Sequence, residues 1–391
     1  MDKILCEVWS GTGDAGHTGP VRIVIAPDKF AGTLTATEAA RAIADGWHDV
    51  DPEAATELVP LSDGGPGFVE VLHTALGGKT VRLDVTGPLG TAVPADYLLD
   101  GDTAYIESAQ ACGLHLVAPD ERDPGRATSR GVGELIAHAI DAGARTVVVG
   151  LGGSATNDAG AGMLAALGAA PGRTLSAGGG ALADLPGPID LAPALRATAG
   201  VRLVAATDVD NPLLGPHGAS AVFGPQKGAD DAQVHHLDRA LAAFADATAA
   251  ATGVPGDPRS VPGAGAAGGL GYALLLLGGT IESGVARVLA AVGLSEQVAA
   301  ADLVITGEGS FDSQSLRGKL PHGVARAAAA HAVPCVVTAG VVSVGREEAA
   351  AAGISATYSL VESAGSTEAA LTRSAAELRR LAADVARRWG R

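Results

Sequence analysis

Aromatic residues, cysteines and long apolar runs are all scarce in this chain of 391 residues. It has three Trp, four Tyr, five Phe and three Cys, so its core must be built from Ala, Val, Leu and Ile. The cysteines lie far apart and form no Cys-x-x-Cys pair, which fits a protein of the reducing cytoplasm. The run YALLLLGG from Tyr272 is far shorter than the roughly 18 residues of a membrane span. No secretion signal is recognisable, so we expect a cytoplasmic protein without a membrane partner.

Basic residues are in the minority, with 27 Lys and Arg against 43 Asp and Glu and a formal net charge of −16. The acids are spread along the chain rather than gathered in a tail. Nucleic acid is therefore not an expected partner. If the ligand is an anion, local lysines, arginines or helix N-termini must reverse the field around its site.

Hydrophobic residues make up 47% of the chain and charged residues 18%, which excludes a disordered protein. Gly (55) and Pro (21) are abundant, so turns are frequent. Because a domain usually has about 100 to 200 residues, the length favours two domains.

Several apolar runs end in Gly or Asp and are each followed by a helical pattern. The runs are VRIVIAPD, TVVVGLGG, VRLVAATD, DLVITGEG and PCVVTAG. Such runs are typical of buried parallel strands, and their alternation with Ala-rich helices predicts the α/β class with a Rossmann-like, doubly wound parallel sheet. Residues 80–110 instead alternate apolar and polar side chains around turn pairs, which indicates an antiparallel meander.

This pattern predicts two domains that are discontinuous in sequence. Residues 21–80 and 296–391 are expected to form the Rossmann-like domain. Residues 81–295 are expected to form a second, inserted α/β domain that begins with the meander. On this interpretation the strand at 302–306 pairs with the strand at 21–26.

Acidic residues stand at or just after the ends of several predicted strands, where ligands bind in open parallel sheets. They are Asp28, Asp63, Asp208, Asp210, Glu308 and Asp312. Any one of these aspartates could simply cap a helix or form an Asx turn. Together, however, they provide the hard oxygen ligands that Mg²⁺ prefers.

The glycine loop, which we define as Gly150–Asp158, follows a predicted strand and opens a helix. Its glycines let backbone N–H groups approach a phosphate, and Ser154, Thr156 and Asn157 add polar groups. The alternative is a tight strand-to-helix turn without a ligand. The spacing also matches the dinucleotide fingerprint Gly-x-Gly-x-x-Ala, but the acidic residue expected about 20 positions later is missing.

Two lysines lie next to glycines just before predicted helices. Lys227 precedes Gly228, and Lys319 follows Gly318. A lysine at such a position can contact a phosphate or a carboxylate together with exposed N–H groups. The alternative is a solvated surface side chain.

Six blocks carry a resemblance to a known family. They are IAPDKFAGTLTATEAA, PLSDGG, GLGGSATNDAGAGMLAALG, DVDNPLLGPHGASAVFGPQKGA, PGAGAAGGLG and DLVITGEGSFDSQSLRGKLPHGVA. From about Val21 to its end the chain resembles the bacterial type of the glycerate kinase family. The resemblance implies two α/β domains with the active site in the cleft between them, ATP as phosphoryl donor, Mg²⁺, and phosphorylation of D-glycerate to 2- or 3-phosphoglycerate. Ala31, Pro66 and Ser310 depart from the family, which often has Lys, Glu and Arg there.

On this resemblance we assign roles to the loop residues. Asp208 would accept the proton of the attacking hydroxyl, Lys227 and Lys319 would hold phosphate or the glycerate carboxylate, and Asp63, Asp210 and Glu308 are the candidates for Mg²⁺. The remaining substrate and nucleotide residues would be Asp28, Lys29, Gly64, Gly65, Gly152, Gly153, Ser154, Thr156, Asn157, Asp158, Asn211, Asp312 and Gln314.

Two functions from other classes are alternatives. A nicotinamide-dependent oxidoreductase would use the loop at Gly150 for pyrophosphate, although the missing ribose-binding acid argues against it. A non-catalytic ligand-binding protein would need no clustered acids. A small molecule is the expected partner in each case, and a homodimer is left open.

Overall fold

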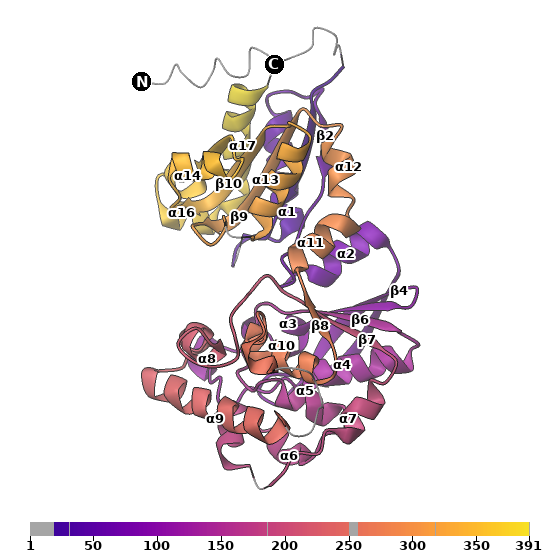
Figure 1. Cartoon of the computed structure of the whole chain (residues 1–391). Coiled ribbons are helices and arrows are strands. Elements are labelled where there is room, and N and C mark those ends of the chain that lie inside the picture. The colour runs from indigo at the N-terminus through magenta and orange to yellow at the C-terminus, as the bar shows by residue number, and fades with distance from the viewer. Residues whose placement is uncertain (1–18, 31, 186, 250–256, 317, 391) are drawn as a thin grey trace.

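The computed structural model describes residues 19–30, 32–185, 187–249, 257–316 and 318–390, so Ala31, Arg317 and most of the N-terminal extension fall outside it. Its strands form one sheet of five, in the order β11-β10-β9-β1-β2, and one sheet of six, in the order β3-β4-β5-β6-β7-β8. Helices cover both sheets (Figure 1). The predicted α/β class is confirmed.

The five-stranded sheet is parallel throughout. It consists of β1 (Arg22–Pro27), β2 (Ala55–Leu58), β9 (Leu303–Phe311), β10 (Cys335–Val342) and β11 (Ala356–Ser359). In β1, Ile23 and Ile25 belong to the core beneath α1 (Ala36–His48) and α17 (Ser374–Trp389). The alternate residues Val24 and Ala26 belong to the core on the opposite face, with α13 (Leu320–Ala330). Because both faces are buried, the strands read as continuous apolar runs.

The six-stranded sheet is mixed. It consists of β3 (Lys79–Thr86), β4 (Ala92–Asp100), β5 (Thr103–Glu107), β6 (Thr146–Gly150), β7 (Arg202–Ala206) and β8 (Thr280–Glu282). The first three strands pair antiparallel, and β5 to β8 pair parallel. The exposed edge strand β3 alternates in burial along its length, which explains the alternating sequence pattern there.

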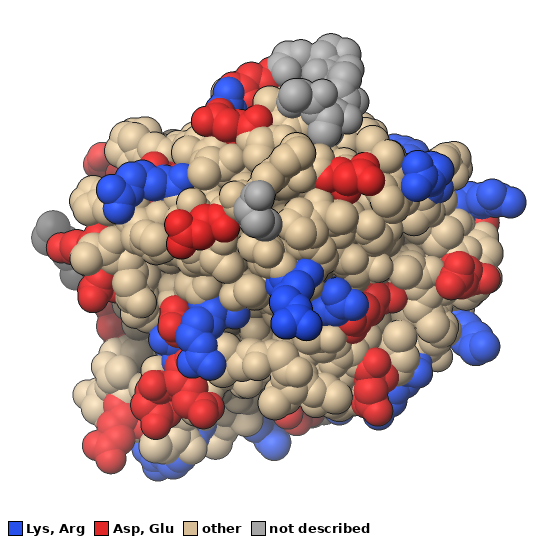
Figure 2. Space-filling view, turned by 90° about the horizontal axis from the view of Figure 1, so that it is seen from below, with Lys and Arg blue, Asp and Glu red and all other residues tan. Residues whose placement is uncertain are grey.

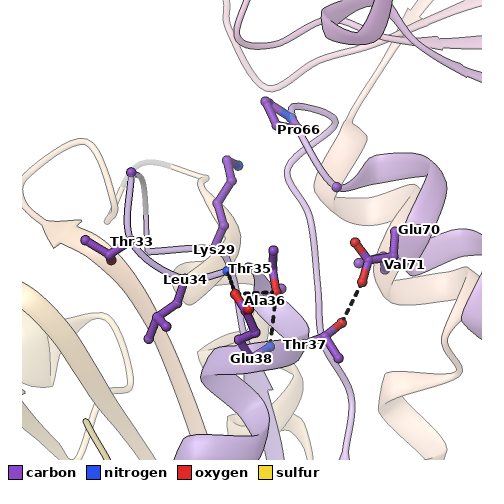
Figure 3. A pocket seen from close by; sticks show the side chains of 12 residues that line it. Lys29, Thr33, Leu34, Thr35, Ala36, Thr37, Glu38, Pro66, Glu70 and Val71 are labelled. Atoms are coloured by element: carbon purple, nitrogen blue, oxygen red, sulfur yellow. Dashed lines mark hydrogen bonds between the residues drawn. The ribbon is translucent and has the colours of Figure 1, made fainter. Parts of the chain in front are cut away.

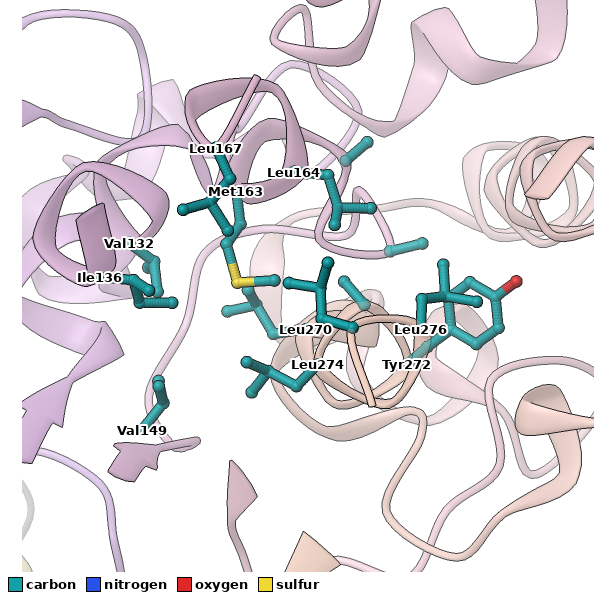
Figure 4. Close-up of a cluster of buried hydrophobic side chains, with 14 of the residues drawn as sticks. Val132, Ile136, Val149, Met163, Leu164, Leu167, Leu270, Tyr272, Leu274 and Leu276 are labelled. Atoms are coloured by element: carbon teal, nitrogen blue, oxygen red, sulfur yellow. The ribbon is translucent and has the colours of Figure 1, made fainter. Parts of the chain in front are cut away.

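One face of the six-stranded sheet carries the largest core. It contains Val149 of β6, Met163 of α5 (Ala161–Ala166), and Leu270 and Leu274 of α10 (Ala266–Leu276), which point toward one another in Figure 4. Ile136 of α4 (Arg130–Asp141) closes this core from the side. Aliphatic side chains thus do the packing that the shortage of aromatic residues requires.

Two helices lie between the sheets, α2 (Phe68–Leu76) and α11 (Gly284–Ala291) (Figure 1). One continuous core includes Phe68 and Leu72 of α2, Val148 and Val204 of the six-stranded sheet, and Val304 of the five-stranded sheet. The two sheets are therefore joined by shared apolar packing.

The pairing of β1 with β9 brings Ile23 opposite Leu303 and Pro27 opposite Gly307. The five-stranded sheet thus draws its strands from chain before residue 60 and after residue 302, and the six-stranded sheet draws its strands from the chain between. On this support we propose the division into 21–80 with 296–391 and an inserted unit 81–295. The helix α2 belongs to the first segment by sequence and packs on β4 and β5 of the second.

Acidic and basic side chains are interspersed on the face seen in Figure 2, and the described residues there form no continuous basic patch. Among the residues that the structure describes, no helix is both long and apolar enough to cross a bilayer. Cys112 and Cys335 are buried and unpaired.

A capping box starts α1, and the close packing of α1 against α17 joins the two ends of the described chain. Thr35 accepts from the Glu38 N–H at 3.2 Å, and the Glu38 carboxylate accepts from the Thr35 N–H at 2.9 Å. Further along α1, a Cβ placed on Gly46 would lie only 2.0 Å from the Arg379 carbonyl oxygen of α17. The two helices can approach this closely only because residue 46 is glycine.

We therefore expect Gly46→Ala to lower the free energy of unfolding by about 1 to 3 kcal/mol, the usual cost of overpacking. This loss should appear although alanine is the better helix former by about 1 kcal/mol. Chemical denaturation monitored by circular dichroism measures it. The matched control is Gly172→Ala at the start of α6 (Gly172–Leu175), where a Cβ would meet nothing within 4 Å. An equal change in both variants would contradict the packing argument.

Candidate active site

The carboxyl ends of the parallel strands in both sheets lead into loops that touch one another. The segment after β2 carries Asp63 and Gly64, and it lies on the glycine loop that follows β6. A Cβ on Gly150 would be 2.5 Å from the Gly64 carbonyl oxygen, and a Cβ on Gly152 would be 2.7 Å from the Gly65 Cα. These close approaches explain the glycines, and they bring the polar residues of two sheets to one place.

A charged cluster at this junction contains Lys29, Asp28 and Asp63. The Lys29 ammonium lies 3.2 Å from Asp63 Oδ1 and 3.4 Å from Asp28 Oδ1. Burial and the charge of Asp63 raise the pKa of Asp28 to about 7, against the opposing charge of Lys29. Burial would also raise the pKa of Asp63, but Lys29 and the Gly65 N–H outweigh it and hold that pKa below its usual value. Asp63 is thus the ionised partner of Lys29.

A second acidic group lies on β9 and in the turn after it. Glu308 is buried, and its Oε1 atom has no hydrogen-bond partner. Burial raises the pKa of Glu308 to about 7, while Ser315 and Lys319 oppose this shift. Asp312 accepts the N–H groups of Gln314 at 2.8 Å and Ser315 at 3.3 Å, which holds the turn in place.

Lys319 stands immediately before α13, as its N-cap residue. Within the described ranges, its ammonium makes no hydrogen bond or ion pair, but it lies within electrostatic reach of Asp63 and Glu308. Its ammonium therefore has donors available for an anion.

Asp208 follows β7 and contacts the start of α11. Its Oδ1 accepts from the Ser283 hydroxyl at 2.5 Å, and its Oδ2 accepts from the Val285 N–H at 2.9 Å. Burial raises the pKa of Asp208, although these hydrogen bonds lower it. A Cβ on Gly284 would lie 2.7 Å from the Asp63 carbonyl oxygen and 3.3 Å from Asp208 Oδ2, so Asp63 and Asp208 flank the same glycine.

Lys227, in a short 3-10 turn (Pro225–Lys227), lies beneath the glycine loop. Only 3% exposed, it donates to the Ser154 hydroxyl at 3.0 Å and to the Thr156 carbonyl at 2.7 Å. Burial lowers the pKa of Lys227 to about 8, against the charge of Asp158. This lysine thus holds the loop from inside, which a solvated surface lysine would not do.

The last residues of the glycine loop are bound by the protein itself. Asp158 accepts the N–H and hydroxyl of Ser129, each at 2.8 Å, and the N–H groups of Gly160 and Gly162. Asn157 donates to Ser220 at 2.8 Å, while its buried Oδ1 lacks a partner. Asp158 therefore fixes the turn from within the protein.

Three other residues named from the sequence have side chains that are exposed or bond outside these clusters. Asp210 and Gln314 are exposed, and Asn211 donates to the His217 carbonyl at 2.8 Å. Nowhere in the described part of the chain are three or more His, Cys, Asp or Glu side chains grouped closely enough to hold a metal ion.

A cavity of about 320 Å³ opens beside Lys29. It lies between the start of α1 and the start of α2, and Thr33, Thr35, Pro66 and Glu70 line it (Figure 3). The Thr37 hydroxyl donates to Glu70 at 3.0 Å and so ties the two helices together at one side of the cavity. Its size suits a small polar molecule.

Reasoning from the sequence missed Glu107 and Ser108, at the end of β5, and Ser283, which bonds Asp208. Glu107 is buried and accepts from the N–H groups of Gly67 at 3.0 Å and Val69 at 3.5 Å. Ser108 donates to the Gly150 carbonyl at 2.7 Å. Glu107 and Ser108 could have been found by the rule used for the other loops, because β5 also ends at the carboxyl edge of a parallel strand pair.

Comparisons with known proteins identify the family of this chain. The chain matches the sequence model of the "Glycerate kinase family" over residues 23–390. It is 46% identical to the glycerate kinase of Bacillus subtilis (strain 168), over 94% of this chain and 97% of that protein. It is 44% identical to the glycerate 2-kinase of Escherichia coli (strain K12), over 90% of this chain and 93% of that protein.

A crystal structure from Salmonella typhimurium LT2, assigned as a glycerate kinase 2, superposes with a TM-score of 0.75 at 41% sequence identity. The match covers 94% of this chain and 98% of that one. The resemblance expected from the six sequence blocks is thus confirmed, and the chain belongs to the glycerate kinase family.

Proposed function

We propose that this enzyme transfers the γ-phosphoryl group of ATP to a hydroxyl of D-glycerate. The observation that carries the proposal is the contact of the Asp63–Gly65 segment with the glycine loop, which brings acids and lysines from two sheets around one place. The E. coli relative is named a glycerate 2-kinase, and on that support we propose the 2-hydroxyl as the acceptor. The relatives reported above are named as kinases and give no support to an oxidoreductase or a non-catalytic binding protein.

In the proposed reaction a glycerate hydroxyl oxygen attacks the γ-phosphorus, the bond to the bridging oxygen breaks, and ADP leaves. Asp208 would take the hydroxyl proton. The Ser283 hydroxyl and the N–H groups of Val285 and Gly284 take up at most three of the four lone-pair sites of its carboxylate, which leaves one for this task. Its raised pKa, caused by burial, makes it a stronger base than an exposed aspartate.

Cations would hold the two anionic reactants. The free ammonium of Lys319 would contact a phosphate or the glycerate carboxylate, and Lys29 would face a small acid bound in the adjoining cavity. The N–H groups near Gly152 and Gly153 would receive the nucleotide phosphates. Lys227 would hold that loop in shape from below through Ser154 and Thr156.

The family implies Mg²⁺, which usually binds one or two carboxylates and otherwise takes waters and substrate phosphates. A single protein ligand is therefore enough, and the unpartnered buried Oε1 of Glu308 fits that role. Asp63, already paired with Lys29, and exposed Asp210 fit it less well. A magnesium ion bound there would neutralise charge on the phosphate oxygens.

A cytoplasmic location fits the unpaired Cys112 and Cys335.

The direct test incubates purified protein with ATP, Mg²⁺ and D-glycerate and follows ADP release. Phosphorus NMR of the product distinguishes the 2-phosphate from the 3-phosphate. L-glycerate and NAD⁺ with D-glycerate serve as comparison reactions. No ADP release with D-glycerate, or reduction of NAD⁺, would overturn the proposed function.

We expect Asp208→Asn to lower kcat by about 10² to 10⁴-fold, because the amide keeps the volume but cannot take a proton. KM values should change little. The matched control is Asp190→Asn, since Asp190 accepts the Ala192 N–H at 2.9 Å at the start of α7 (Ala192–Ala197), remote in sequence from the site loops. Steady-state kinetics on both variants decide, and wild-type turnover in Asp208→Asn would remove Asp208 as the base.

The two lysines should differ when changed to methionine. Lys319→Met should lower kcat/KM by roughly ten- to a hundredfold, the value of one charge-assisted hydrogen bond, and leave thermal stability nearly unchanged. Lys227→Met should lower activity and also the melting temperature, because the Thr156 carbonyl loses its buried partner.

The control for both lysines is Lys79→Met on the exposed edge strand β3, which should alter neither quantity. Calorimetry and kinetics varying each substrate measure the effects. Unaltered kcat/KM in Lys319→Met would show that Lys319 is a solvated side chain that does not bind an anionic substrate.

A further inference from the structure

The end of β5 contacts both loops of the site. Glu107 and Ser108 are neighbours in sequence, yet their side chains bond to different segments of chain. Glu107 reaches the segment that follows Asp63, at Gly67 and Val69, and Ser108 reaches the first residue of the glycine loop. Both side chains are buried, with Glu107 4% and Ser108 0% exposed.

Glu107 does for α2 what a side chain of the helix itself usually does. The N-cap residue of α2 is Gly67, in the left-handed region at φ 97°, and it has no side chain to accept the first N–H groups. The acceptor comes instead from a strand 40 residues further along the chain. The start of α2, and the Asp63 segment immediately before it, are thereby tied to the six-stranded sheet.

Ser108 makes the second link. Glu107 pairs in register with Gly150 across β5 and β6, and the Ser108 hydroxyl donates to the Gly150 carbonyl. Gly150 is also the residue on which a Cβ would collide with the Gly64 carbonyl. The contact between the two loops therefore lies directly beside the two hydrogen-bonding side chains.

Glu107 also interacts electrostatically with Lys29. Burial raises the pKa of Glu107, and the N–H groups of Val69 and Gly67 together with the charge of Lys29 oppose that shift. Lys29 therefore experiences three carboxylates, from Asp28, Asp63 and Glu107. A change at residue 107 would therefore reach the Lys29–Asp63 pair in two ways: through the backbone of the Asp63 segment and through the electrostatic field at Lys29.

We propose that Glu107 and Ser108 form a brace that sets the distance between the Asp63 segment and the glycine loop, and hence between the two reactants. The proposal rests on the proposed phosphoryl transfer and assigns to it two positioning residues. Neither side chain needs to touch a substrate. On the proposed function, the nucleotide phosphates bind at the glycine loop and the acid binds beside Lys29, which pairs with Asp63. A broken brace would therefore leave both substrates bound and misplace one relative to the other.

The purely structural alternative is that Glu107 only stabilises α2. That role predicts a lower melting temperature with an unchanged kcat for the molecules that remain folded. The brace predicts a lower kcat at nearly unchanged KM for both ATP and D-glycerate, since only the relative placement of the reactants is lost.

The experiment compares Glu107→Ala, Ser108→Ala and the double variant in steady-state kinetics. We expect each single variant to lower kcat by about ten- to a hundredfold, the effect of misplacing reactants by about 1 Å. The double variant should lose little more than either single one, because one broken link already releases the loops. Glu107→Gln keeps an acceptor oxygen in place and should recover part of the loss.

The matched control is Glu134→Ala in α4. Glu134 likewise accepts a backbone N–H and a hydroxyl, both from Thr86, at 2.7 and 2.9 Å. Thr86, however, is the last residue of the edge strand β3. This variant should lower stability and leave kcat unchanged.

Hydrogen exchange provides a readout that does not depend on activity. Glu107→Ala should speed exchange of the amides at 64–69 and also at 150–154, whereas Glu134→Ala should do neither. Unchanged exchange at 150–154 together with unchanged kcat overturns the brace. If the wild-type enzyme fails to phosphorylate D-glycerate, the proposed function falls, and the exchange data alone decide the brace.

Discussion

The close contact between the Gly64–Gly65 turn and the glycine loop is the constraint on which the site depends. At Gly150 and Gly152 a Cβ would lie within 2.7 Å of the opposite turn, and such a clash is with backbone that cannot move aside cheaply. Any side chain there would force the two sheets apart at their carboxyl edges. Asp63 lies in the turn that makes this contact, Lys29 pairs with Asp63, and Asp208 flanks the same glycine, Gly284, as Asp63.

The second constraint is charge, because an acidic protein must bind two anions at a site crowded with carboxylates. The structure meets it by burying several of those acids, and the pKa of Asp28 and that of Glu308 each rise to about 7. At neutral pH Asp28 is therefore only partly ionised, which reduces the repulsion of a phosphate. Asp63, held ionised by Lys29, is the exception, so its charge is matched by a cation on the spot.

Much of the fold could be predicted because buried parallel strands are apolar on both faces. The runs around Ile25, Val148, Val204 and Ile305 are all strands of the expected kind. Partners that are distant in sequence could not be predicted. Nothing near Gly67 indicates that its N–H bonds to Glu107.

Local pattern also cannot distinguish an acid that closes a turn from an acid that does chemistry. Asp158 and Asp208 both follow a parallel strand and precede a helix, and both accept backbone N–H groups. Asp158 is fully buried with four donors around it, so it has no capacity for a ligand. Asp208 accepts at most three, from Ser283, Val285 and Gly284, lies half-buried, and so retains a lone pair. The two carboxylates differ in how many hydrogen-bond donors the surrounding fold directs at them. For Asp158 this number depends on Ser129, 29 positions away, and for Asp208 it depends on Ser283, 75 positions away.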